Sequence, residues 1–217
     1  GLVFLVMGGA IVFVSGIAWR WMLGGGIAAG LLAPVLYFFV LGNHQKERIL
    51  TFINPSRDIS DAGWNAHQSL LAVGSGGITG KGFMNGTQHA LGYLPQSVAP
   101  TDFIFSVIGE EVGFVGAGAV VCALAGVLIC CLRIAFVARD YFGAYICIGV
   151  AALIFTHSYI NIGMTMHAAP VIGIPLPFVS YGGSFMLGMA VCIGLVQSVH
   201  VRRRKMQGNE IILVKRR

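Results

Sequence analysis

The run Val112–Leu132, VGFVGAGAVVCALAGVLICCL, decides the fold class, because it carries no charge and is long enough to cross a bilayer. A membrane-spanning helix needs about 20 mostly apolar residues. The chain is 56% hydrophobic and 10% charged, with a mean hydropathy of +0.81. The sequence therefore predicts an all-α integral membrane protein with five transmembrane helices. They are Leu2–Ile17, Trp21–Leu41, Phe103–Leu132, Phe142–Met164 and Ile172–Val199.

These helices divide the chain into four segments. Two helices occupy residues 1–42, a long polar loop residues 43–101, three helices residues 102–200, and a basic tail residues 201–217. Ten of the 14 Lys and Arg residues lie in the two short connections and the tail. By the positive-inside rule this basic side is cytoplasmic, so the polar loop faces outward. The net charge of +6 thus reflects topology, and we expect no nucleic-acid partner.

The polar loop contains two local patterns. Residues Ala62–Val73 read as a short amphipathic helix that ends at Gly74, where a glycine C-cap is expected. The glycine-rich run Gly74–Gly82 follows and contains Lys81. Its N–H groups and its cation suit a phosphate, but a flexible linker explains the same composition equally well. Loops of this length are usually functional.

Asp102 stands where the chain re-enters the membrane, immediately before Phe103. Apolar surroundings raise the pKa of a carboxylate and make it a better base. The alternative is an N-cap, because Asp before an apolar helical run satisfies free N–H groups. Both interpretations remain open from the residues alone.

The start of the fifth helix is irregular, because Pro175 and Pro177 are followed by Gly182-Gly183. Non-helical backbone at membrane depth is tolerated only where protein or a watery cavity covers it. Proline-broken segments also mark substrate sites in transporters. The pattern is therefore typical of two classes, an outward-facing enzyme with a cavity and a transporter.

The run Gly173–Ser184, GIPLPFVSYGGS, preceded by Asn161-Ile-Gly163, resembles the signature of the SEDS proteins RodA, FtsW and SpoVE. The loop glycines, the run Thr101–Phe105 and Glu110-Glu111 support the resemblance in the same order. Gly80-Lys81-Gly82 and Gly86-Thr87-Gln88 are more RodA-like than FtsW-like.

This resemblance implies a peptidoglycan glycosyltransferase in the bacterial cytoplasmic membrane. Family members have ten helices and polymerise lipid II, undecaprenyl-diphosphate disaccharide-pentapeptide, at the outer face during cell elongation or division. A class B penicillin-binding protein is their partner. The chain resembles the second half of that bundle, so we expect it to be part of a longer protein and inactive alone.

The resemblance also identifies candidate site residues. Asp102 matches the acid that the family needs, and it would act as the base for the acceptor sugar hydroxyl. Arg48 and Lys81 are the loop cations expected to meet the diphosphate. Further substrate-binding candidates are Gln68, Ser180 and Tyr181.

We assign no metal ligands, because the cysteines lie in the spans and the loop histidines lack ligand spacing. A divalent cation, Mg or Mn, could share the diphosphate with the loop cations.

Two alternatives to the enzyme remain. A lipid-precursor transporter or flippase would use the same broken helices, but it would need no acid for sugar transfer. A non-catalytic scaffold for the penicillin-binding protein would tolerate loss of Asp102.

Overall fold

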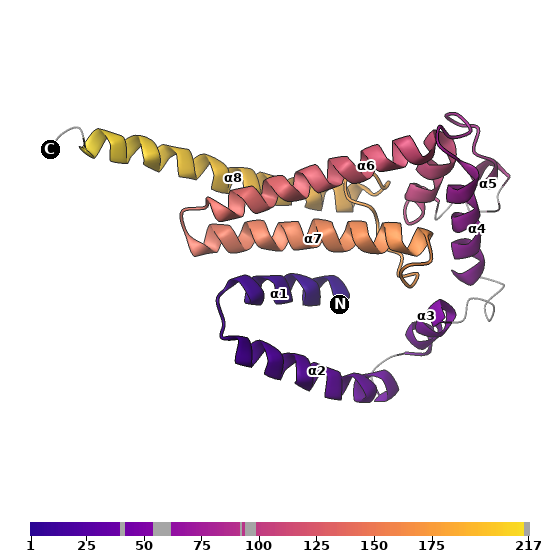
Figure 1. The fold of residues 1–217 in the computed structure, drawn as a ribbon, viewed down its shortest axis with the longest axis horizontal. Helices are drawn as coiled ribbons and strands as arrows, with labels where there is room; N and C mark the ends of the chain where they lie inside the picture. The colour runs from indigo at the N-terminus through magenta and orange to yellow at the C-terminus, as the bar shows by residue number, and fades with distance from the viewer. Residues whose placement is uncertain (40–41, 54–61, 92, 94–98, 215–217) are drawn as a thin grey trace. The chain divides into compact units, whose positions relative to one another are not determined.

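The computed structural model describes residues 1–39, 42–53, 62–91, 93 and 99–214, and the regular elements in these ranges are all helices (Figure 1). This confirms the all-α class. In chain order they are α1 (Leu2–Val14), α2 (Trp19–Phe39), α3 (Asn43–Ile53), α4 (Ala62–Ser75), α5 (Thr87–Ala90), α6 (Ile104–Phe136), α7 (Tyr141–Thr165) and α8 (Gly183–Val214).

Three helices of the described residues are long and apolar enough to cross a membrane. They are α6, α7 and the part of α8 from Gly183 to Arg202. α1 is apolar but has only 13 residues, and α2 has 21 residues with Pro34 inside it. The coarse prediction of a helical membrane protein therefore stands on these three helices.

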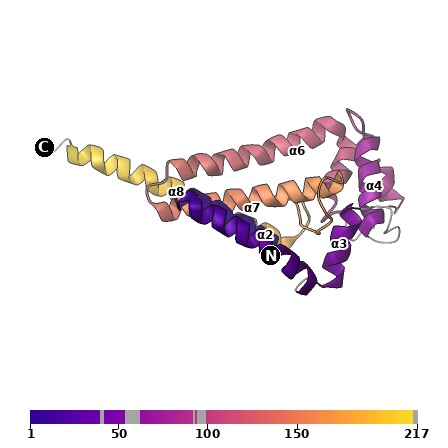
Figure 2. The same cartoon turned by 60° about the horizontal axis from the view of Figure 1, so that its bottom comes forward.

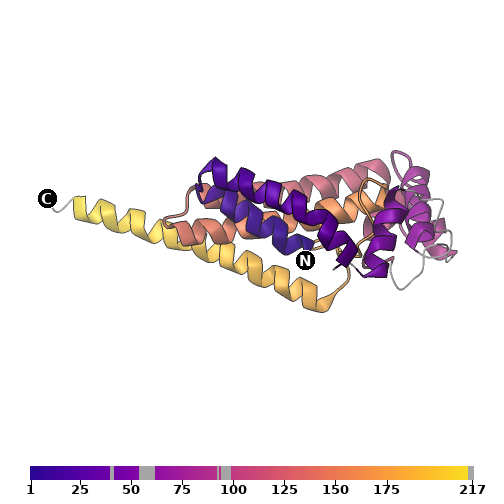
Figure 3. The ribbon, with the colours of Figure 1, turned by 90° about the horizontal axis from the view of Figure 1, so that it is seen from below.

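The boundaries differ from the sequence prediction at several points. The fifth predicted span begins at Gly183 and not at Ile172, because residues 170–176 carry no regular hydrogen-bonded structure and a turn follows them. The amphipathic helix in the loop is present as α4, and it continues past Gly74 to Ser75. The helices α3 and α5, within the predicted loop, had no counterpart in the sequence analysis. The basic tail begins inside α8, which Figure 3 shows as one continuous helix.

The chain forms two compact units. The first contains residues 1–16, 122–156 and 183–217, and the second contains residues 17–121 and 157–182. All six candidate site residues, from Arg48 to Tyr181, belong to the second unit. The functional argument therefore concerns the second unit alone.

In the first unit, α6 and α7 run antiparallel from the turn at residues 137–140 (Figures 1 and 2). Asp140 begins α7 by accepting a hydrogen bond from the Gly143 amide at 3.0 Å. Glycine also lets α8 approach α7, because a Cβ on Gly143 would lie 3.1 Å from Val199. Such small residues allow close helix packing in lipid, where apolar surface alone does not drive association.

In the second unit, α4 packs against the end of α7 and the start of α6. Ser69 of α4 donates its hydroxyl to the carbonyl of Thr165 at 3.2 Å, and both residues are fully buried. A Cβ on Gly109 of α6 would touch Val73 of α4 at 3.3 Å. This packing fixes one end of α6, where Asp102 lies.

Candidate functional site

Asp102 lies two residues before Ile104, the first residue of α6, and its side chain is partly buried. Burial raises the pKa of the Asp102 carboxyl, while a hydrogen bond with the Thr101 side chain and the positive charge of Arg48 oppose that rise. Phe103 takes the position directly before the helix, and its carbonyl accepts the Ser106 amide at 3.0 Å. This placement does not favour the N-cap alternative for Asp102.

The backbone of Asp102 is held by Asn161, a fully buried residue of α7. The Nδ2 atom of Asn161 donates to the carbonyl oxygen of Asp102 at 2.8 Å and to that of Ile174 at 2.7 Å. One amide group therefore joins the start of α6 to the irregular run before α8. This explains why Asn161 accompanies the proline-rich run in the sequence.

Gly173 brings that irregular run against the carboxylate. Its φ is +74°, and a Cβ at this position would lie 3.1 Å from Oδ2 of Asp102. Any side chain here would be strained and would press on the carboxylate, since positive φ is readily adopted only by glycine. Gly173 thus leaves room beside Asp102.

Ser180 and Tyr181, both predicted to bind substrate, are placed differently from each other. The buried hydroxyl of Ser180 donates to the carbonyl of Thr101 at 2.5 Å and accepts the amide of Leu176 at 2.7 Å. The Tyr181 amide donates to the carbonyl of Pro100 at 3.0 Å, while its ring is exposed. Ser180 thus positions the residue before Asp102, and Tyr181 offers an accessible ring in the same region.

Arg48 extends from α3 to the same place. Its Nη1 atom donates to the carbonyl of Ile172 at 2.8 Å, and its charge acts on Asp102. Arg48 is otherwise exposed. A guanidinium has five donors, so one bond to Ile172 leaves others for an anionic group. The structure therefore brings together Arg48, Asp102 and the run Ile172–Tyr181.

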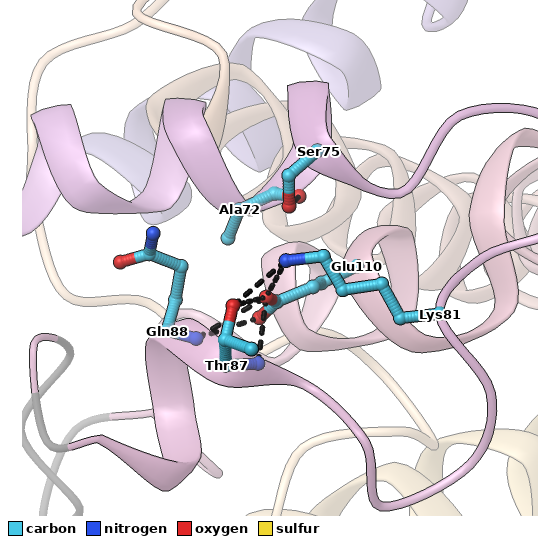
Figure 4. Close-up of polar contacts among 6 residues, drawn as sticks. All are labelled: Ala72, Ser75, Lys81, Thr87, Gln88 and Glu110. Atoms are coloured by element: carbon cyan, nitrogen blue, oxygen red, sulfur yellow. Dashed lines mark hydrogen bonds and ion pairs between the residues drawn. The ribbon is translucent and has the colours of Figure 1, made fainter.

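Lys81 lies in a second cluster, which the sequence analysis did not predict (Figure 4). Its Nζ atom lies 2.6 Å from Oε1 of Glu110 and 2.7 Å from Oγ1 of Thr87. Glu110 is only 1% exposed, and it also accepts the amides of Thr87 at 2.8 Å and Gln88 at 3.2 Å. The charge that Lys81 would offer to a diphosphate is thus balanced by a buried carboxylate.

A general signal in the sequence pointed to this pair. Acids at membrane depth are costly and normally face a partner or a cavity. Glu110 lies inside the predicted span, and Lys81 is the nearest loop cation before it. Charge alone could not select Lys81 over Arg48, because the choice depends on how the loop folds back.

The glycine-rich segment is not a free linker, because part of its backbone is hydrogen-bonded to α6. The amides of Lys81 and Gly82 donate to the carbonyls of Glu110 and Glu111 at 3.0 and 2.9 Å. In the other direction, the amides of Phe114 and Val115 donate to the carbonyls of Gly77 and Ile78. These bonds bracket Gly113, whose φ of +70° interrupts α6.

The glycines of this segment permit that contact. A Cβ on Gly76 or Gly80 would lie about 2 Å from a backbone oxygen of α6. The segment is therefore attached to α6 by its backbone, along the interrupted turn.

Gln68, the remaining predicted site residue, is buried on α4 beside Ser69. His67, the residue before it, is exposed. Within the described ranges, no three His, Cys, Asp or Glu side chains lie together as a metal site.

The known proteins similar to this chain include peptidoglycan glycosyltransferases. Residues 1–205 match the sequence profile of the FtsW, RodA and SpoVE family, described as cell cycle proteins. The peptidoglycan glycosyltransferase MrdB of Escherichia coli K12 is 38% identical over 200 residues, covering 89% of this chain and 52% of MrdB. The RodA peptidoglycan glycosyltransferase of Treponema pallidum is 39% identical over 171 residues, covering 79% of this chain and 39% of RodA.

Further relatives agree with these two. A probable peptidoglycan glycosyltransferase FtsW of Geobacter sulfurreducens is 35% identical over 204 residues, covering 93% of this chain and 52% of its own. A chain from a solved peptidoglycan synthase complex, which coordinates polymerization and crosslinking, matches with a TM-score of 0.74 and 30% identity. That match covers 93% of this chain and 55% of the other. The chain thus spans about half the length of the curated relatives it matches.

Proposed function

Since this chain belongs to the family of FtsW, RodA and SpoVE cell cycle proteins, we propose that it is part of a peptidoglycan glycosyltransferase. The whole protein polymerises lipid II into glycan strands during cell elongation or division. The observation that carries the proposal is the partly buried carboxylate of Asp102, which has Arg48 nearby and space beside it at Gly173, on a backbone that Asn161 holds. We expect the 217 residues alone to be inactive.

In the proposed reaction, Asp102 acts as general base. The 4-hydroxyl oxygen of the acceptor sugar forms a bond to the anomeric carbon of the donor, and its proton passes to the Asp102 carboxylate. The bond from the anomeric carbon to the lipid diphosphate breaks, and the diphosphate leaves with the electron pair. The raised pKa of Asp102 supports this role, because a more basic carboxylate accepts the proton more readily.

Arg48 is the cation best placed to bind the leaving diphosphate. Its exposed guanidinium lies on the same side as Asp102, and it is suited to phosphate oxygens. Lys81 is the weaker candidate, since Glu110 already balances its charge. The exposed ring of Tyr181 and the amide of Gln68 remain proposed contacts to sugar or peptide. A Mg or Mn ion, if the reaction uses one, would share with Arg48 the role of stabilising the charge on the diphosphate.

The proposal includes the arrangement in the membrane. We propose five spans in the cytoplasmic membrane, with residues 43–101 outside and the basic tail inside. A cysteine at Asn85 should then react with a membrane-impermeant thiol reagent in intact cells, while one at Gly208 should react only after lysis. The reverse pattern would overturn the outward-facing site.

We also propose a class B penicillin-binding protein as partner. The likeness to a chain of a peptidoglycan synthase complex supports this assembly. Co-purification of the full-length protein with that partner tests it, and recovery of the full-length protein alone from the same membranes would count against it.

The test of the reaction is glycan synthesis by the full-length protein with its partner in detergent, where transport between compartments cannot occur. We expect lipid II to be elongated, and Asp102→Asn to lower the rate by about 10²–10⁴-fold, the usual contribution of a positioned base. Asn65→Asp, at a partly exposed position of the loop helix α4, is a control for a general effect of an Asn/Asp exchange. No elongation in detergent, with lipid movement in vesicles, would favour the transporter. Near-normal synthesis by Asp102→Asn would exclude Asp102 as the base.

A further inference from the structure

The glycine-rich segment, taken here to include the turn that follows it as far as Gly86, carries three large exposed apolar side chains. Ile78, Phe83 and Met84 are 73%, 80% and 78% exposed, respectively, although they lie outside the membrane-spanning helices. Isolated apolar residues on a surface are ordinary, whereas a group of large ones marks an interaction site. The question is what covers this group.

The segment is held in place against α6. Hydrogen bonds run from the amides of Lys81 and Gly82 to α6, and from the amides of Phe114 and Val115 back to the segment. The ion pair between the side chains of Lys81 and Glu110 also holds the segment against α6. Met84 has a φ of +62°, a conformation that a non-glycine residue keeps only where its surroundings impose it. Ile78, Phe83 and Met84, called the apolar tip below, are therefore held in a fixed position relative to α6.

The same hydrogen bonds set the level of the tip along α6. The bond from the Val115 amide to the Ile78 carbonyl, 3.2 Å long, places Ile78 beside the first residues of the apolar run of α6. Phe114 and Val115 are themselves exposed, on a helix that is long and apolar enough to cross the membrane. Exposed apolar residues of α6 and of the segment therefore lie at the same level along this helix.

The charges of the segment are compatible with lipid. Between Ser75 and Gln88, Lys81 is the only charged residue, and the buried Glu110 balances it. The segment can therefore enter the membrane interface without burying an unpaired charge. The side chain of Glu111 lies against Gly86, at the other end of the segment. This acid limits the depth of the tip to the boundary between headgroups and acyl chains.

We propose that Ile78, Phe83 and Met84 insert into the outer leaflet and anchor the glycine-rich segment to the membrane interface beside α6. The occupant is membrane lipid, because the tip lies beside exposed apolar residues of a helix long and apolar enough to cross a membrane, and its one charge is paired. Aromatic and long apolar side chains are the usual anchors at this level. The inference rests on α6 crossing the membrane and goes beyond the proposed reaction.

The test uses the full-length protein in lipid nanodiscs, with the native cysteines replaced. A single cysteine at Phe83 is labelled with the environment-sensitive fluorophore NBD, and Asn85→Cys on the same segment is the matched control. Quenching is measured with lipids brominated near the headgroup end of the acyl chain and with aqueous iodide. Ile78→Cys gives a second position should labelling at Phe83 disturb the fold, as judged by thermal unfolding.

We expect the probe at Phe83 to show a blue-shifted emission, quenching by the brominated lipid and protection from iodide, with the reverse at Asn85. Equal iodide quenching at both positions, without lipid quenching, would overturn the proposal. Protection of Phe83 that appears only after a purified class B penicillin-binding protein is added would also overturn it, because the surface would then bind protein.

Discussion

Asn161 donates a hydrogen bond from Nδ2 to the backbone carbonyl of Asp102 at 2.8 Å, across a separation of 59 residues in the chain. The same atom donates to the carbonyl of Ile174 at 2.7 Å. The position of the candidate base thus depends on a residue that carries no charge and is fully buried.

Replacing Asn161 with Leu should therefore weaken both fold and activity. The change keeps a similar volume but leaves the carbonyls of Asp102 and Ile174 without this donor. We expect a loss of about 1–3 kcal/mol in the free energy of unfolding, the usual penalty for an unsatisfied buried group. Thermal unfolding measures the effect on stability. Glycan synthesis, assayed well below the midpoint temperature of unfolding, measures the effect on activity. Thr156→Val is the control, because the Thr156 hydroxyl donates to Ala152 within α7 itself. Equal, small effects of both variants would contradict the positioning role.

Gly173→Ala should impair activity through the Asp102 carboxylate. The added Cβ would lie 3.1 Å from Oδ2 of Asp102, at a φ of +74°. The left-handed conformation costs a non-glycine residue about 1–2 kcal/mol, so a modest fall in thermal stability should accompany the loss of glycan synthesis. Gly183→Ala is the matched control, since a Cβ there meets open space. Full activity of Gly173→Ala would show that the space beside the carboxylate is not needed.

The raised pKa of Asp102 predicts that the difference in stability between wild type and Asp102→Asn depends on pH. The folded state binds the Asp102 proton more tightly than the unfolded state does. Its contribution to stability is thus complete below the unfolded pKa, about 3.9 for Asp, and is lost as the pH rises through the folded pKa.

Asp102→Asn cannot ionise, so we expect it to be at least as stable as wild type at neutral pH. Its advantage should shrink as the pH falls towards about 4, the usual range of an Asp carboxyl. Thermal unfolding of both proteins across this range is the measurement. An Asn variant that is less stable at neutral pH, with the difference vanishing in acid, would reverse the predicted sign.

The Lys81–Glu110 pair should behave as a coupled unit. Lys81→Met leaves the Glu110 carboxylate buried without its cation, and we expect a loss of about 3 kcal/mol, the lower end for a broken buried pair. Combining it with Glu110→Gln should recover part of that loss, because the uncompensated charge is then removed. Denaturation of the two single variants and the double variant gives the coupling energy. Additive losses would show that the two residues act independently.

Much of the membrane architecture could be read from the residues. Uninterrupted apolar length predicted α6 and α7 closely, because burial in lipid requires about 20 apolar residues whatever the neighbouring chain does. The amphipathic period of Ala62–Val73 predicted α4 for a similarly local reason. Asp102 was identified as a candidate for two reasons. Its place before Phe103 is visible in the sequence, and it matches the acid in the family that the chain resembles.

The features that the sequence did not predict depend on contacts between segments far apart in the chain. Lys81 and Arg48 are both loop cations by composition, yet Lys81 pairs with Glu110 while Arg48 lies near Asp102. Ser180 reads as a substrate contact in the signature run, but its hydroxyl is used to hold Thr101. The composition of the glycine run is compatible with a phosphate loop or a linker. Only the structure shows that amides of this run donate to carbonyls of α6. Local apolar length sets which segments are helices, since it acts on each segment alone. The partner of each polar group is a property of the folded chain, because buried donors and acceptors must be satisfied by whatever the packing brings within reach.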